Sequence, residues 1–249
     1  MLCLFLIVIG LRLASLSYFP PPIPKVHDEF SYLLGADLLA SGRAALPAHP
    51  LWEFFDTIHV IGTPVYASKY PPGQAIFLAL GQLLFGHAYA GVVISAGLAT
   101  VTVFWMLLAL VPPGVALIGG LQVAVVFSSL HYWMQSYWGG AVALSGAAIV
   151  LGSAIRMLRW ADVRSGWLLG LGAALLLVSR PYEGGVLVLL LTIPVALRAW
   201  TTRGLRQAFR RSGAALAPAL LCLGWYNYQV TGHPYVLPYS LYERTYAAV

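Results

Sequence analysis

Residues 89–111 read YAGVVISAGLATVTVFWMLLALV, a run that contains no charged side chain. A helix needs about 20 residues to cross the hydrocarbon core of a bilayer, so this run predicts a membrane-spanning helix. Apolar runs on either side of it predict further spans, near 2–19, 114–131, 139–156, 166–179, 184–200 and 213–230. We therefore expect an all-α fold, a polytopic membrane helix bundle of about seven spans, with residues 1–249 forming a single transmembrane domain.

The composition is that of a membrane protein. The chain is 60% hydrophobic and 9% charged, with a mean hydropathy of +0.81, whereas soluble domains carry roughly 25% charged residues. The net charge of +6 does not indicate a nucleic-acid partner, because the positive charges concentrate in two short loops, as membrane topology requires. Cys3 and Cys222 lie in apolar runs and are expected to pack as small hydrophobic side chains.

Arginines in two connections between spans set the predicted orientation. The connections 156–165 and 198–211 carry three and five arginines, and cytoplasmic loops are enriched in basic residues. Both connections are therefore expected in the cytoplasm, together with the N-terminus of a multi-pass protein of the plasma (inner) membrane. The loops 20–88, 131–138 and 180–183 and the tail 231–249 then face the periplasmic or extracellular side, and together they hold all six histidines and seven of the eight acidic residues. We expect any catalysis on that outer face.

The first outer loop, residues 20–88, is predicted to carry two short helices. Residues 28–41 show an amphipathic pattern with one apolar stripe that suits the membrane surface. This stripe consists of Phe30, Leu33, Leu34 and Leu38. The apolar piece 74–86 is too short to cross a bilayer alone, so we expect an interfacial or re-entrant helix there.

An acidic pair, Asp28-Glu29, opens the first of these helices. Asp28 is expected at the N-cap, where backbone N–H groups and the helix dipole favour an ionised carboxylate. Asp28 as a simple cap is one interpretation, and a solvated rim of charges is another. Neither cap nor dipole explains why Glu29, His27 and Lys25 crowd beside it. A base or ligand site that faces a lipid-borne substrate is the functional interpretation.

Two further segments carry charge at the outer face. Lys69-Tyr70 precedes Pro71-Pro72-Gly73, where a helix start offers free N–H groups that attract phosphate. An ordinary helix entry with one snorkelling lysine is the alternative. In the second segment, Arg180-Pro181-Tyr182-Glu183, the two charges either pair with each other or leave Arg180 free for an anionic headgroup.

The remaining polar and aromatic residues indicate no metal centre or cofactor. The histidines lack the spacing of a metal-binding motif, so we expect no metal, and nothing supports a divalent cation. The aromatic clusters 131–138 and 225–228 fit an interfacial belt, although a few of these rings could stack on a sugar.

Together these residues resemble a known family, the GT-C-type integral membrane glycosyltransferases. The resemblance is to the bacterial group related to the lipid A aminoarabinose transferase and the protein O-mannosyltransferases. It is carried by His27-Asp28-Glu29-Phe30, Tyr70-Pro71-Pro72-Gly73 and Arg180-Pro181-Tyr182-Glu183-Gly184, and the segment 227–234 is also similar to a loop of that group.

The resemblance implies transfer of a sugar from a polyprenyl-phosphate donor to a glycolipid, glycan or protein acceptor of the cell envelope. It makes Asp28 the residue that acts on the acceptor hydroxyl, with Glu29 a candidate second acid. The candidate substrate-binding residues are His27, Lys69, Tyr70, Arg180, Tyr182 and Glu183.

Three features depart from the family pattern. Tyr70 stands where relatives have a lysine directly before Pro-Pro, and residues 131–138 hold no second acid, so that Glu29 or Glu183 would replace it. The chain is also short for the family, which predicts a fragment or a minimal form. A transporter and a non-catalytic membrane subunit of an envelope-assembly complex are the alternative functions. A transporter needs ionisable residues within its spans, which here are nearly charge-free apart from Arg12.

Overall fold

The computed structural model describes residues 1–246 and is largely helical, with 73% helix and 3% strand. This confirms the all-α class. A π-helical turn, Val126–Leu130, continues α5, and 3-10 helices cover Trp52–Phe55 (η1) and Tyr132–Gln135. The α-helices are α1 (Leu2–Ser15), α2 (His27–Ala40), α3 (Gly73–Phe85), α4 (Ala88–Leu107), α5 (Pro113–Val125), α6 (Gly140–Trp160), α7 (Ser165–Ser179), α8 (Pro181–Ala199), α9 (Arg203–Thr231) and α10 (Pro238–Tyr246).

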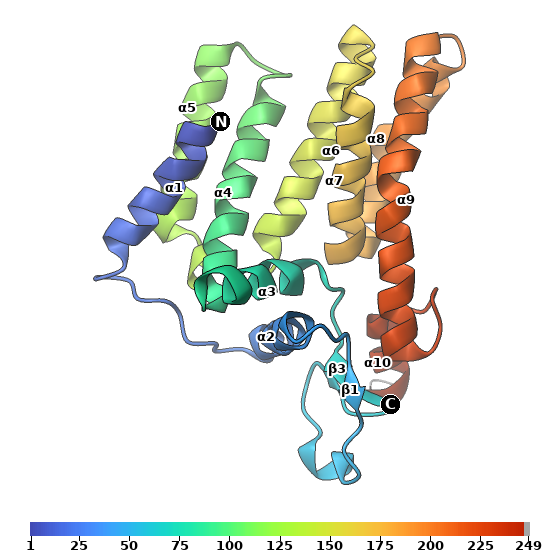
Figure 1. The fold of residues 1–249 in the computed structure, drawn as a ribbon. Helices are drawn as coiled ribbons and strands as arrows, with labels where there is room; N and C mark the ends of the chain where they lie inside the picture. The colour runs from blue at the N-terminus through green and yellow to red at the C-terminus, as the bar shows by residue number, and fades with distance from the viewer. Residues whose placement is uncertain (247–249) are drawn as a thin grey trace.

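The longer helices form a bundle with two unlike ends (Figure 1). Helices α1 and α4 to α9 run roughly alongside one another, and successive members point in alternating directions. The short helices α2, α3 and α10 gather at one end of this bundle, whereas the α6–α7 and α8–α9 junctions lie at the other. Basic residues flank both of these junctions, so the positive charge collects at the end opposite α2 and α3.

Among residues 1–246, four helical segments are long and apolar enough to cross a membrane: α4, Pro113–Gln135, α6 and α8. Helices α1 and α7 contain 14 and 15 residues. A helix needs about 20 residues to cross the hydrocarbon core, so both are short for a span. Helix α9 is long, but its first nine residues include four arginines. The structure therefore supports a membrane protein with four candidate spans rather than the seven predicted, and the other three stay a prediction.

Helices α2 and α3 each begin one residue before the predicted ranges 28–41 and 74–86, whereas the predicted position of these helices at the membrane surface stays a prediction. Helix α3 begins directly after Pro72 and crosses α4 with very little room. A Cβ added at Gly91 would lie 2.0 Å from the Phe77 carbonyl oxygen. One added at Gly73 would lie 2.6 Å from the Val178 carbonyl oxygen, at the end of α7. Helix α3 is thus wedged between α4 and α7, which fixes the segment just before it.

A small antiparallel sheet, which the sequence did not predict, completes this end of the molecule. Its strands are β1 (Leu46–Pro47), β2 (Val60–Ile61) and β3 (Val65–Ser68), in the order β1-β3-β2. Buried Ile61 and Ala67 pack with Tyr226 and Val230 of α9, so the sheet is anchored on the bundle. Strand β3 leads directly into Lys69 and Tyr70.

Candidate functional site

Asp28 lies in the first turn of α2 and not at its N-cap, which is Val26 and makes no side-chain capping bond. The prediction of an N-cap aspartate was wrong, because the helix begins one residue earlier. The Asp28 carboxylate instead faces two other segments. Its Oδ1 atom accepts a hydrogen bond from the Tyr70 hydroxyl and lies 3.1 Å from His59 Nε2. Its side chain is 26% exposed, so a ligand from outside can still reach it.

Tyr70 connects Asp28 to a second ring. Burial and the hydrogen bond to Asp28 raise the pKa of Tyr70, so its hydroxyl stays protonated and donates. The Tyr32 ring stacks on that of Tyr70, with centroids 4.4 Å apart. Burial raises the pKa of Tyr32 to about 12, and the positive charge of Arg180 opposes this shift. Arg180 therefore lies within electrostatic reach of the cluster around Asp28.

Lys69 is a buried cation held in an aromatic cage. Its side chain is only 4% exposed, and its Nζ lies 4.4 Å from the ring centroid of Tyr242, 4.8 Å from Tyr239 and 5.3 Å from Tyr70. Burial lowers the pKa of Lys69, while the negative charges of Glu243 and Asp28 oppose this. Within residues 1–246, no ion pair within 4.0 Å joins Lys69 to a carboxylate. The ring faces stabilise the ammonium group and leave it able to attract an anion.

His59 belongs to the site, although sequence reasoning missed it. It has a φ of 70°, in the left-handed region, and lies immediately before β2. Its carbonyl oxygen accepts a 2.6 Å bond from Ser31 Oγ, and its N–H donates to the Tyr242 hydroxyl at 3.1 Å. Burial, followed by the charge of Lys69, lowers the pKa of His59, so the neutral imidazole is favoured. No motif surrounds His59 in the chain, and only the tertiary fold brings it to Asp28.

Glu29 and His27 lie apart from these contacts. Glu29 is 3% exposed, and its two carboxylate oxygens accept backbone hydrogen bonds from Lys25 at 3.1 Å and Tyr137 at 3.0 Å. These bonds tie α2 to the segment before α6, and they give Glu29 a structural role. His27 is exposed and reaches the cluster only through its electrostatic effect on the pKa of His59.

Arg180, Tyr182 and Glu183 lie at the junction of α7 and α8. Arg180 Nη1 is 3.9 Å from Glu183 Oε1, but these side chains are 45% and 71% exposed, so the pair contributes little stability. The Tyr182 hydroxyl lies 3.2 Å from Ser240 Oγ of α10. Arg180 and Glu183 also line a groove of about 420 Å³, whose other walls are largely apolar. These walls include Trp133, Trp138, Leu144, Leu176 and Leu187.

No group of three or more His, Cys, Asp or Glu side chains that could hold a metal ion occurs among the described residues. Comparison of the chain with models of known protein families, with curated proteins and with solved structures gave no match. The class of protein is therefore assigned from the fold and the site alone. The chain is a helical membrane protein that gathers a carboxylate, an imidazole, tyrosines and a caged lysine at one end of its bundle.

Proposed function

We propose that the protein is a membrane glycosyltransferase that moves a sugar from a polyprenyl-phosphate donor to a hydroxyl of a cell-envelope acceptor. Asp28 acts as the general base. The acceptor oxygen attacks the anomeric carbon while its proton passes to the Asp28 carboxylate. The bond between the anomeric carbon and the phosphate oxygen breaks, and its electron pair leaves with the polyprenyl phosphate.

The observation that carries this proposal is the contact of Asp28 with Tyr70 and His59, near the Lys69 ammonium, which has no ion pair within 4.0 Å among residues 1–246. The carboxylate is held by the Tyr70 hydroxyl, and its 26% exposure leaves room for an incoming acceptor. The departing phosphate needs a positive charge nearby, and the buried Lys69 ammonium can supply it through space, without direct contact. A transfer from a lipid phosphate requires a base and an anion-stabilising cation, and here Asp28 and Lys69 both contact Tyr70.

The groove beside Arg180 supports a lipid donor. Its apolar walls between α6, α7 and α8 suit an isoprenoid chain, and Arg180 at its edge suits the phosphate. The Arg180 charge acts on Tyr32, and the Tyr32 ring stacks on Tyr70, which bonds Asp28. A donor with its chain in the groove would therefore bring its phosphate toward the cluster.

The proposal includes an orientation in the plasma membrane. The N-terminus and the arginine-rich junctions lie in the cytoplasm, and seven helices, α1 and α4 to α9, cross the bilayer. The end with α2, α3 and the site then faces the periplasm or the cell exterior. The alternating directions of the helices and the collection of arginines at one end support this topology.

The test is a transfer assay with the purified protein in lipid vesicles. It is incubated with radiolabelled polyprenyl-phosphate sugars and a cell-envelope extract. We expect label to move into envelope material from at least one lipid-linked donor and none from the corresponding nucleotide sugars. No transfer from any polyprenyl-phosphate sugar, or equal transfer from nucleotide sugars, would contradict the proposal.

A further inference from the structure

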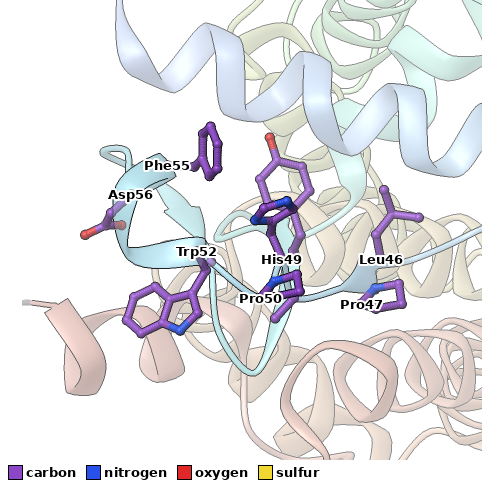
Figure 2. A pocket seen from close by; sticks show the side chains of 10 residues that line it. Leu46, Pro47, His49, Pro50, Trp52, Phe55 and Asp56 are labelled. Carbon is purple, nitrogen blue, oxygen red and sulfur yellow. The ribbon is translucent and has the colours of Figure 1, made fainter.

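The segment between α2 and α3 forms a lobe with a pocket that the proposed catalytic cluster does not use. The pocket has a volume of about 730 Å³ and lies between β1, η1 and β3 (Figure 2). Its lining residues are Leu46, Pro47, Ala48, His49, Pro50, Trp52, Phe55, Asp56, Gly62 and Tyr66. It is lined by aromatic rings and a single carboxylate, and it lies on the same end of the molecule as Asp28.

The polar side chains of the pocket include both donors and acceptors: His49, Asp56, the Tyr66 hydroxyl and the Trp52 indole N–H. His49 Nδ1 accepts a hydrogen bond of 3.1 Å from the Leu51 N–H, so the imidazole proton resides on Nε2, which can donate. The Asp56 side chain is exposed and can accept. A hydroxyl-rich ligand can satisfy both groups, because a hydroxyl donates and accepts.

Flat rings supply the other half of the recognition. Trp52, Tyr66, Phe55 and His49 all line the pocket, and the His49 and Phe55 rings meet edge to face with centroids 5.0 Å apart. The C–H faces of sugar rings pack on aromatic faces while their hydroxyls bond polar groups at the rim. Few, well-placed polar groups among aromatic walls are the usual composition of a small-ligand site.

The pocket and the proposed catalytic site take residues from the same stretch of chain, β3 and the two residues that follow it. Tyr66 lies in β3 and Lys69 directly follows this strand. At the usual rise of a strand, their Cα atoms are about 10 Å apart. Helix α10 supports both regions, because the Tyr246 hydroxyl accepts from the Gly62 N–H at 2.9 Å and the Tyr242 hydroxyl accepts from the His59 N–H. A short glycan can bridge such a distance.

We propose that this pocket binds a saccharide unit of the acceptor, which makes the acceptor a glycan. This inference rests on the proposed function, since it places the glycan end near Asp28 and an inner sugar unit on Trp52 and Tyr66. A peptide that carries the acceptor hydroxyl is the competing occupant.

The experiment measures binding without any donor. The protein in detergent is titrated calorimetrically with neutral hexose and N-acetylhexosamine trisaccharides, and with a Pro-rich decapeptide. We expect saturable binding of at least one trisaccharide, weakened at least tenfold by Trp52→Ala and by Phe55→Ala. Phe54→Ala is the matched control, because Phe54 is in the same 3-10 helix, is 81% exposed and does not line the pocket.

The two pocket variants guard against a folding artefact. Trp52 packs against Gly62, so its loss could loosen the lobe, whereas Phe55 is 64% exposed and its loss leaves the core intact. Binding of the decapeptide alone, binding of no trisaccharide, or trisaccharide binding that survives both variants would overturn the inference. Transfer without saccharide binding would contradict this pocket assignment only. Saccharide binding without transfer would contradict the proposed function and leave the pocket a saccharide site.

Discussion

At the scale of single residues, each buried or half-buried charge of the site is stabilised by neighbouring polar groups or ring faces. Asp28 accepts from Tyr70 and lies against His59, while Lys69 is surrounded by ring faces. Glu29, the neighbour of Asp28, has both oxygens occupied by backbone N–H groups. Adjacent carboxylates in one helix turn therefore have different environments, one structural and one open to a ligand.

Removal of the Tyr70 hydroxyl should slow transfer without weakening donor binding. A hydrogen bond to a charged group contributes about 1.5 kcal/mol or more, so Tyr70→Phe is expected to lower kcat about tenfold. The KM for the lipid-linked donor should change little, because the lost bond holds the base. Steady-state kinetics of this variant and of Tyr18→Phe, whose ring is 82% exposed, separate the two effects. A rise in KM at constant kcat would contradict the assignment.

His59 makes the stability of the site depend on pH. The pKa of His59 in the folded protein is below its unfolded value of about 6.5. The contribution of His59 to the free energy of unfolding is therefore fully present above about pH 6.5 and is lost as the pH falls through the folded pKa. His59→Asn lacks this titration and tolerates the positive φ. The difference in unfolding temperature between wild type and His59→Asn should shrink from about pH 7.5 to about pH 5. A difference that grows on acidification would contradict the account.

At the scale of elements, α3 is the wedge that positions Lys69 and Tyr70. Its first residue, Gly73, meets the end of α7, and Gly91 of α4 approaches the Phe77 carbonyl oxygen with no space for a Cβ. The close crossing fixes how far α3 can move. The segment before it, which carries the lysine and the tyrosine, is thereby fixed as well.

A methyl group at this crossing should destabilise the protein. Gly91→Ala would place Cβ 2.0 Å from the Phe77 carbonyl oxygen, and such overpacking typically costs about 1–3 kcal/mol. Gly185→Ala is the matched control, because Gly185 is also helical and has nothing within 4 Å of an added Cβ. Thermal unfolding in detergent should show a lower midpoint for Gly91→Ala and no decrease for Gly185→Ala. Equal midpoints would show that the crossing is not close.

The sequence predicted the helices better than the site. Apolar runs and Pro71-Pro72 locate α3 within a residue, because helix breakers act locally. The strands are two to four residues long and show no alternation that periodicity could detect. His59 contacts Asp28 across 30 intervening residues, and no local pattern encodes a contact of that range. Asp28 and Lys69 were found because charged residues at the rim of an apolar protein are conspicuous.

At the scale of the whole molecule, charge is divided between two ends. Eight of the twelve arginines lie around the α6–α7 and α8–α9 junctions, whereas Asp28 and the lobe lie at the opposite end. Basic residues remain on the cytoplasmic side of a membrane, so this division predicts which end faces outward. It also separates the proposed site from the cytoplasm.

Labelling of single cysteines tests this orientation. In a background with Cys3 and Cys222 replaced by serine, Glu53→Cys should react with a membrane-impermeant maleimide from the outside of intact cells. Thr201→Cys, at the α8–α9 junction, should react only after the membrane is permeabilised. Both positions are exposed, so access to the side chain depends on sidedness. The reverse pattern, or equal labelling of both, would contradict the topology.

The most direct test of the central claim compares two aspartates of one helix. Asp28→Asn removes the proposed base but keeps its size, whereas Asp37→Asn alters an exposed aspartate of α2 that only accepts from Gln82. General-base catalysis contributes about 10²–10⁴-fold to the rate of a reaction. The initial rate of sugar transfer should therefore fall by a factor of about 10² or more in Asp28→Asn. Asp37→Asn should transfer at the wild-type rate, and both variants should remain folded at the assay temperature. A wild-type rate in Asp28→Asn would contradict the account.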